Sequence, residues 1–257
     1  MGERSETEGL LQWLEESGRA LELRVLRAFR RHAEARHAVY HRDQESGKPR
    51  EVDVMARFHG SRGGVSRPHF DVVVECKTGK PGSQWVAFRD ESTPARFPPA
   101  KDLWLAPSEP GRKTSFEGAW DWRPPFSDRV NVSSIVTAHD GRDSAHAAVQ
   151  QVLSAVEAQI DHVRRHEVQS AQRVDQSSGA ITTWSTTEVG VMGLVVTTVP
   201  IYVAELGDDN SPRVTPVEVV AVPTGWEAPA GPVWVFIARE TALRTTVSDL
   251  SKAAERL

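Results

Sequence analysis

The fold of this chain is decided by two stretches, REVDVMA at residues 50–56 and FDVVVECK at residues 70–77. Both are short, valine-rich and alternating in character, which predicts β-strands. Successive side chains of a strand point to opposite faces of the sheet. We therefore expect Glu75 and Lys77 to share one face of the second strand, and Cys76 to face the apolar side as part of the core.

The first strand is predicted to bring a second carboxylate to the same place. Val52 and Val54 are expected to share one face, with Asp53 on the other. If the strands pair through their apolar sides, Asp53 approaches Glu75 and Lys77. Charged groups among valines lose hydration and need partners or a metal ion. Carboxylate oxygens suit Mg²⁺ or Mn²⁺, and a lysine can hold a water molecule or offset the charge of a phosphate.

These residues resemble the active-site motif of the PD-(D/E)XK, or restriction-endonuclease-like, nuclease superfamily. Asp53 matches the aspartate of the motif, Glu75 its second acid and Lys77 its lysine. Cys76 stands at the variable position between the last two. The chain departs from the motif at Val52, where the family has a loosely kept proline. The alternative interpretation is an ordinary solvated hairpin in which Glu75 and Lys77 form a surface ion pair.

The resemblance implies an α/β (α+β) fold with a restriction-endonuclease-like core, in which helices flank a central mixed β-sheet. It implies a Mg²⁺- or Mn²⁺-dependent nuclease in which Asp53 and Glu75 bind metal and Lys77 positions or activates water. The expected substrate is DNA, cut by an endonuclease in bacterial restriction, phage defence or repair. A protein partner or an activating signal is expected to restrain such an enzyme, and a homodimer is one option for its oligomeric state. The alternative function is a non-catalytic module that keeps the nuclease fold and binds nucleic acid or a protein.

The composition sets wider bounds. At 257 residues the chain is long enough for one large domain, and we expect a single domain over residues 1–257. One cysteine excludes an intramolecular disulfide, which is typical of a reducing compartment. The sequence contains no bilayer-length apolar run and no secretory signal, so we expect no membrane association and a cytoplasmic location. A net charge of −4 gives no overall attraction to nucleic acid, which leaves that role to local patches.

Residues 6–36 are expected to be helical, with two helices possible if they meet near Gly18. The buried side is marked by apolar residues at spacings typical of a helix: Leu10, Leu14, Leu21, Val25 and Phe29. Glu22 lies at the edge of this apolar face. The resemblance implies that Glu22 is a fourth catalytic residue and a metal ligand. The alternative is that Glu22 pairs with a nearby arginine.

Several polar residues are candidates for contacts with nucleic acid. Arg24, Arg27 and Arg31 form a basic stripe that can follow a phosphate backbone, or that can be a solvated face. Arg62 lies in the glycine- and arginine-rich segment between the motif strands, which can reach toward a groove. Gln150, on the next predicted helix, is a candidate because some branches of the family carry a glutamine near the active site in that helix.

The rest of the chain is expected to complete the sheet and its cover. Residues 89–134 are rich in Pro and Trp and lack periodicity, which predicts an insertion folded over the edge of the core. Trp85, just before this insertion, is expected in the core. Periodicity predicts the other elements by range: a strand at 37–41, a helix at 144–166, strands at 193–198, 200–205, 215–222 and 232–238, and a final helix at 241–257.

Overall fold

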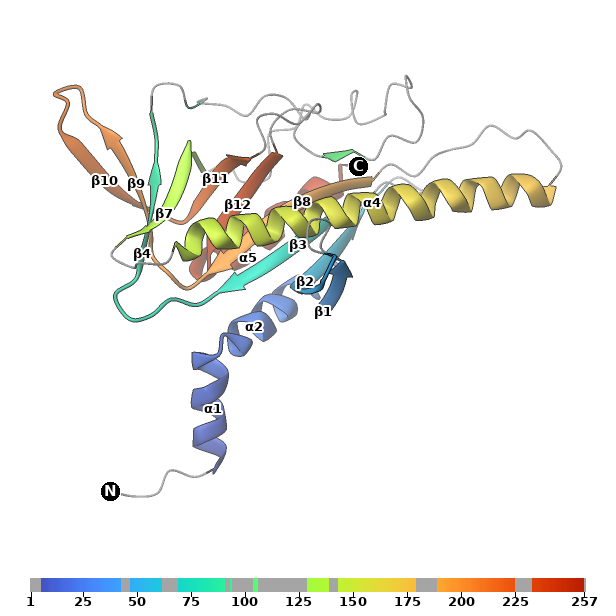
Figure 1. Ribbon diagram of the computed structural model, residues 1–257, viewed down its shortest axis with the longest axis horizontal. Coiled ribbons are helices and arrows are strands. Elements are labelled where there is room, and N and C mark those ends of the chain that lie inside the picture. The colour runs from blue at the N-terminus through green and yellow to red at the C-terminus, as the bar shows by residue number, and fades with distance from the viewer. Residues whose placement is uncertain are drawn as a thin grey trace.

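The computed structural model describes residues 6–42, 47–61, 69–90, 93, 104–105, 129–138, 143–178, 189–224 and 233–256. Over these residues the chain forms a mixed α/β structure, with a large mixed sheet flanked by helices and a second, smaller sheet (Figure 1). The predicted class, a central mixed sheet flanked by helices, is confirmed. Arg62 and most of the predicted insertion at residues 89–134 lie outside the described residues.

The helices are α1 (Glu6–Glu16), α2 (Arg19–Phe29), α4 (Ser144–Ser178) and α5 (Leu243–Ala254), with a short 3₁₀ helix, η1 (Glu240–Ala242), before α5. The larger sheet contains β1 (Glu34–Arg42), β2 (Pro49–His59), β3 (His69–Lys77), β5 (Trp104–Leu105), β6 (Val130–Asn131), β8 (Val189–Thr197), β11 (Val219–Thr224) and β12 (Val233–Arg239). The smaller sheet contains β4 (Gln84–Phe88), β7 (Ser134–Ala138), β9 (Ile201–Leu206) and β10 (Pro212–Val217).

In the described residues the larger sheet has the strand order β1-β2-β3-β8-β12-β11-β6, and β5 pairs with β8. The first three strands are antiparallel, whereas β8 runs parallel to β3. A parallel neighbour needs a crossover connection, and α4 lies in the chain between these two strands. This topology puts β3, which carries Glu75 and Lys77, in the interior of the sheet, where its backbone is held on both sides.

Two clusters of buried apolar side chains lie on opposite faces of the larger sheet. One cluster contains residues of α2 and α5, and the other joins the sheet to α4 and to the smaller sheet. Strand β8 contributes to both, because Leu194 belongs to the first cluster and Val195 to the second. Trp85 of β4, predicted in the core, is fully buried in the second cluster.

The N-terminal helical region follows the prediction only in part. Two helices do meet at Gly18, whose φ of +82° glycine adopts without strain. The second helix ends at Phe29 and not at Arg36, because the apolar spacing stops there and β1 begins at Glu34. The prediction of a buried stripe is wrong for α1, since Leu10 is 63% exposed and α1 contains no buried residue. Figure 1 shows the reason: α1 extends away from the sheets.

The single strand predicted over residues 215–222 is two strands in two different sheets. β10 pairs with β9 in the smaller sheet, and β11 pairs with β12 in the larger one. The chain changes sheet at Glu218, whose carboxylate accepts hydrogen bonds from Arg239 at 2.7 Å and from Thr241. The helix predicted over residues 144–166 is longer than expected, since α4 extends to Ser178.

The predicted alternation in β2 also breaks at one point. Val54 packs in the cluster next to α2, as expected, but Val52 packs in the cluster next to α4. In the register of β1 with β2, His37 pairs with Val54 and Val39 pairs with Val52. The residue between them on each strand is skipped in this register. Those two residues are Asp53 and Ala38, and Ala38 has a φ of +55°. A local irregularity of this kind reverses the faces of the residues beyond it.

Close packing of α4 on β8 generates a stability prediction. A Cβ atom at Gly193 would lie 2.4 Å from Cγ1 of Val152, whereas one at Gly190 would lie 3.3 Å from Cβ of Phe70. We expect Gly193→Ala to lower the free energy of unfolding by about 2 kcal/mol, as overpacking does, and the matched Gly190→Ala to cost less than half of that. Urea unfolding measures both. Adding Val152→Ala to Gly193→Ala should recover stability; if the two losses simply add, the predicted clash is wrong.

Candidate metal and catalytic site

Asp53 lies where strands β2 and β3 stop pairing. The register of the two strands ends at Val54–Val74, and one residue further Oδ2 of Asp53 accepts a hydrogen bond of 2.6 Å from the backbone N–H of Cys76. The carboxylate therefore takes the place of a strand carbonyl. Because the backbone donor belongs to the residue between Glu75 and Lys77, this bond fixes Asp53 beside both of them.

Glu75 and Lys77 form an ion pair at the C-terminal end of β3. The ammonium Nζ of Lys77 donates to Oε1 of Glu75 at 2.6 Å. The Glu75 side chain is largely buried and that of Lys77 is about a quarter exposed, at 26%. The predicted shared face is confirmed. The alternative of a solvated surface pair fits poorly, because the carboxylate of Glu75 is buried and not solvated.

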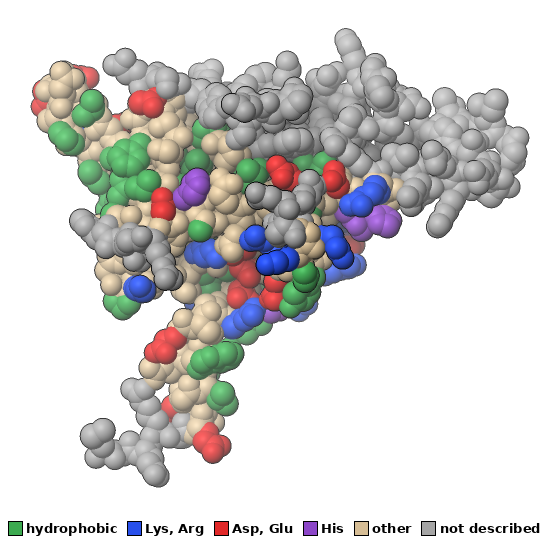
Figure 2. Space-filling model, viewed as in Figure 1, with side chains coloured by type: hydrophobic (Ala, Val, Ile, Leu, Met, Phe, Trp, Pro, Cys, Tyr) green, Lys and Arg blue, Asp and Glu red, His purple; other side chains and the backbone are tan. Residues whose placement is uncertain are grey.

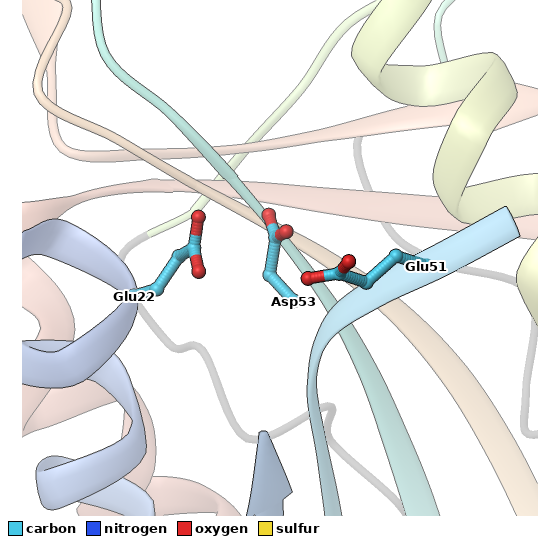
Figure 3. Close-up of side chains that lie close together, drawn as sticks. All are labelled: Glu22, Glu51 and Asp53. Atoms are coloured by element: carbon cyan, nitrogen blue, oxygen red, sulfur yellow. The ribbon is translucent and has the colours of Figure 1, made fainter. Parts of the chain in front are cut away.

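Two further carboxylates complete a cluster with Asp53. Glu22 is contributed by α2 and Glu51 by β2, two residues before Asp53. One oxygen from each of the three groups lies within 4.8 Å of the others. Figure 3 shows the carboxylates of Glu22 and Glu51 on either side of Asp53. We call Glu22, Glu51 and Asp53 the carboxylate cluster.

The carboxylate cluster is held by a ring of hydrogen-bond donors. Arg19 donates to Oε2 of Glu22 at 2.7 Å and to Oε1 of Glu51 at 3.1 Å. The ring nitrogen Nε2 of His37 lies 2.8 Å from Oε2 of Glu22, and the hydroxyl of Tyr40 donates to Oε2 of Glu51 at 2.8 Å. The alternative that Glu22 pairs with a nearby arginine is therefore confirmed, and Glu22 also lies beside Asp53, where a metal ligand would have to lie.

The cluster and the Glu75–Lys77 pair share one electrostatic environment. Burial, and then the charge of Glu75, raise the pKa of Asp53 to about 7. Burial also raises the pKa of Glu75, against the opposing effect of Lys77. The pKa of Glu51 is lowered, because it accepts hydrogen bonds from Tyr40 and Arg19. Asp53 is thus the carboxylate whose negative charge the protein compensates least.

This donor set fits a divalent cation. Mg²⁺ and Mn²⁺ prefer carboxylate oxygens, and the cluster offers three within 4.8 Å of one another. Burial, and then the charge of Glu75, raise the pKa of Asp53, and a bound cation would favour the ionised form of this carboxylate. Of the three metal ligands predicted from the sequence, Glu22 and Asp53 belong to the cluster. Glu75 does not belong to it but lies close enough to affect the pKa of Asp53.

The predicted basic stripe does not form as expected. Arg24 is already paired with Glu15 at 2.8 Å and with Glu240. Arg27 is exposed on α2, and Arg31 lies beyond the end of that helix, so the three arginines do not share one helical face. Gln150 is exposed on α4 and no contact with the cluster is recorded for it.

Two residues of this region were not predicted from the sequence. Glu51 belongs to the carboxylate cluster. It could have been predicted from its position two residues before Asp53, because residues two apart on a strand share a face. Gln159 is a buried glutamine of α4, and it donates to Oδ2 of Asp71 at 2.7 Å. Its burial could have been predicted from its position on the apolar face of the helix, since it follows Val152 by seven residues and Val156 by three. Asp71, only 1% exposed, also accepts two hydrogen bonds from Arg57.

The raised pKa of Asp53 predicts how stability depends on pH in the metal-free protein. A carboxyl group whose pKa is raised by folding favours the folded state at low pH, and this contribution is lost as the pH rises through about 7. In EDTA, Asp53→Asn should therefore gain stability relative to the wild type between about pH 5 and pH 8, by roughly 2 kcal/mol. Urea unfolding across this range measures the difference. Asp209→Asn, an exposed control, should show no such trend, and a pH-independent difference for Asp53→Asn would contradict the assignment.

None of the helices in the described part of the chain has the length and apolar character needed to cross a lipid bilayer. Comparison of the chain with protein-family models, with curated proteins and with solved structures finds no match. Function is therefore argued from the chemistry of the carboxylate cluster and of the Glu75–Lys77 pair.

Proposed function

We propose that the protein is a Mg²⁺-dependent nuclease of the restriction-endonuclease-like type that hydrolyses phosphodiester bonds in DNA. One observation carries this proposal: Asp53 is fixed beside Glu75 and Lys77 and also belongs to a carboxylate cluster. A lysine next to several buried or partly buried carboxylates suits the hydrolysis of a phosphodiester, which needs both bound cations and a held water. A purely structural ion pair would not need the second and third carboxylates.

The order of the elements supports the same proposal. Helix α2 precedes three antiparallel strands, and α4 then leads to β8, which runs parallel to β3. In the fold that the sequence resembles, a helix likewise follows the motif hairpin and packs on the sheet. The proposed active site lies where β2 and β3 separate, so that side chains from both strands and from α2 reach one point.

Each residue then has a proposed role. Glu22, Glu51 and Asp53 would hold the cation, with Glu75 next to them. When bound, Mg²⁺ would supply positive charge against the phosphate and favour the ionised form of these carboxylates. Lys77 donates one hydrogen bond to Glu75 and has two further N–H groups, so it can orient the attacking water against the phosphorus atom. The ion pair with Glu75 keeps the Lys77 ammonium at the end of β3 while it does so.

Cleavage of DNA tests the proposed function directly. Supercoiled and linear DNA should be cut with Mg²⁺ and left intact with EDTA. We expect Lys77→Ala and Glu75→Ala to lower the cutting rate by roughly a hundredfold or more, since Lys77 orients the attacking water and Glu75 holds the Lys77 ammonium in place. Lys252→Ala is the matched control, because Lys252 is an exposed lysine on α5. Cutting that persists in EDTA, or at full rate in both site variants, would contradict the proposal.

Metal binding provides a second test, in which Arg19 is the informative residue. Arg19 places a positive charge against Glu22 and Glu51, where a metal ion would bind. We expect Arg19→Gln to increase the affinity for Mn²⁺ roughly fivefold, about 1 kcal/mol for a partly exposed charge. Arg24→Gln, on the same helix but paired with Glu15 and Glu240, should leave the affinity unchanged. Calorimetric titration measures both, and a wild-type protein that takes up no Mn²⁺ would instead favour the non-catalytic binding module.

A further inference from the structure

A groove of about 1150 Å³ lies next to the carboxylate cluster, between β1, β2 and α4. It follows β1 from Glu34 to Arg42, which spans about 26 Å at about 3.3 Å per residue. Its apolar lining comes from both strands and from the helix: Val39, Val52, Met55, Ala155 and Ala158. None of the roles proposed above for the carboxylates or for Lys77 uses this groove.

Tyr40 connects the groove to the carboxylate cluster. Its side chain lines the groove and is 66% exposed, an unusual position for a large aromatic ring. Its hydroxyl donates to Glu51 at 2.8 Å, which fixes one edge of the ring at the cluster. A chain lying in the groove would therefore pass the cluster at Tyr40.

Positive charge predominates along the groove. Arg36, Arg42 and Arg165 line it, and within the described residues no carboxylate forms an ion pair with them. Of the acidic lining residues, Asp71 is matched by two hydrogen bonds from Arg57, at 2.7 and 2.8 Å. Figure 2 shows Lys and Arg side chains around a group of Asp and Glu side chains on this face of the molecule, between α2 and α4.

Two more acidic groups line the groove. Nε2 of His59 lies 3.0 Å from Oε1 of Glu34, so this carboxylate has a hydrogen-bond partner. Asp161 is the remaining acid, one turn before Arg165, whose Nε donates to the backbone oxygen of Asp161 at 3.2 Å. In the described part of the chain, the groove lining thus contains four arginines, counting Arg57, and three carboxylates.

We propose that this groove binds an unpaired strand of DNA and leads it past the carboxylate cluster, with a base stacked on Tyr40. The proposal rests on the proposed nuclease function and adds the substrate class. An apolar floor and an exposed ring contact the faces of bases, which a duplex keeps stacked inside the helix, and arginines on the rim contact phosphates. An unpaired strand offers both surfaces, and a duplex offers only its phosphates.

Binding in EDTA tests this proposal without any cleavage. The probe is a fluorescent oligodeoxythymidylate of roughly 12 nucleotides, within the range of known single-strand sites. By fluorescence anisotropy, we expect it to bind at least about tenfold more tightly than a duplex of the same length. Tyr40→Ala should weaken binding about tenfold or more, and Tyr40→Phe, which keeps the ring and loses the bond to Glu51, should bind like the wild type.

Variants of the arginines that line the groove test its contacts with phosphates. Arg42→Gln should weaken binding and reduce the slope of log affinity against log salt by about 0.7, the contribution of one phosphate contact. Arg213→Gln, an exposed arginine on β10 in the smaller sheet, should change neither quantity. Thermal unfolding of each variant shows whether its fold is intact. Equal or tighter binding of duplex, tighter binding of RNA of matched sequence, or wild-type affinity in Tyr40→Ala would each overturn the proposal.

The two proposals fail in different ways. If the groove variants lose binding and no DNA is cut with Mg²⁺, the nuclease proposal is wrong and the groove is still a binding site for unpaired DNA. If the wild type cuts DNA and both Tyr40→Ala and Arg42→Gln bind the oligonucleotide with wild-type affinity, the nuclease proposal stands and the proposal that the groove binds DNA is wrong. Because anisotropy is read in EDTA and cutting in Mg²⁺, each outcome is assigned to one of the proposals.

Discussion

The hydrogen bond from the Cys76 amide to Asp53 is the interaction on which the candidate site depends. A backbone N–H of an interior strand must find an acceptor, and here a side chain supplies it in place of the neighbouring strand. Because no backbone carbonyl of β2 is needed as the acceptor for this N–H, β2 is free to turn away from β3 beyond Val54. The turn brings Glu51 beside Glu22 and moves Val52 to the face covered by α4. One unconventional acceptor thus opens the sheet at the point where the charged side chains gather.

Such a gathering of carboxylates costs folding free energy, and the surrounding structure offsets only part of that cost. Arg19 and Lys77 compensate the groups at the edges, Glu22 and Glu75. Asp53, between them, is left with the largest rise in pKa. A cluster selected for stability alone would be expected to replace at least one of these acids with an apolar or neutral residue. Uncompensated charge at a fixed position is more readily explained by a ligand that the protein binds than by the packing of its own chain.

Sequence patterns predicted the parts of the structure that repeat regularly. The shared face of Glu75 and Lys77 followed from alternation within a strand, and the helix after the hairpin followed from apolar spacing. The patterns failed where tertiary contacts override the local signal. Val52 changed face because the pairing of β1 with β2 skips its neighbour Asp53, and Leu10 is exposed although its spacing is that of a core helix. Local periodicity contains no information on which surface, if any, covers a stripe, or on which backbone donor a carboxylate meets.

The parallel pairing of β3 with β8 has a consequence for how the protein is made. Glu75 pairs with Val195, about 120 residues later in the chain, and loop closure over such a distance is slow. During synthesis, α2, β1, β2 and β3 leave the ribosome well before β8 does. Until then one edge of β3 has no strand beside it, and α4 has no complete sheet on which to pack. The carboxylates and Lys77 therefore reach their final arrangement late, so a nascent chain carries the chemical groups of the site long before it has the site itself.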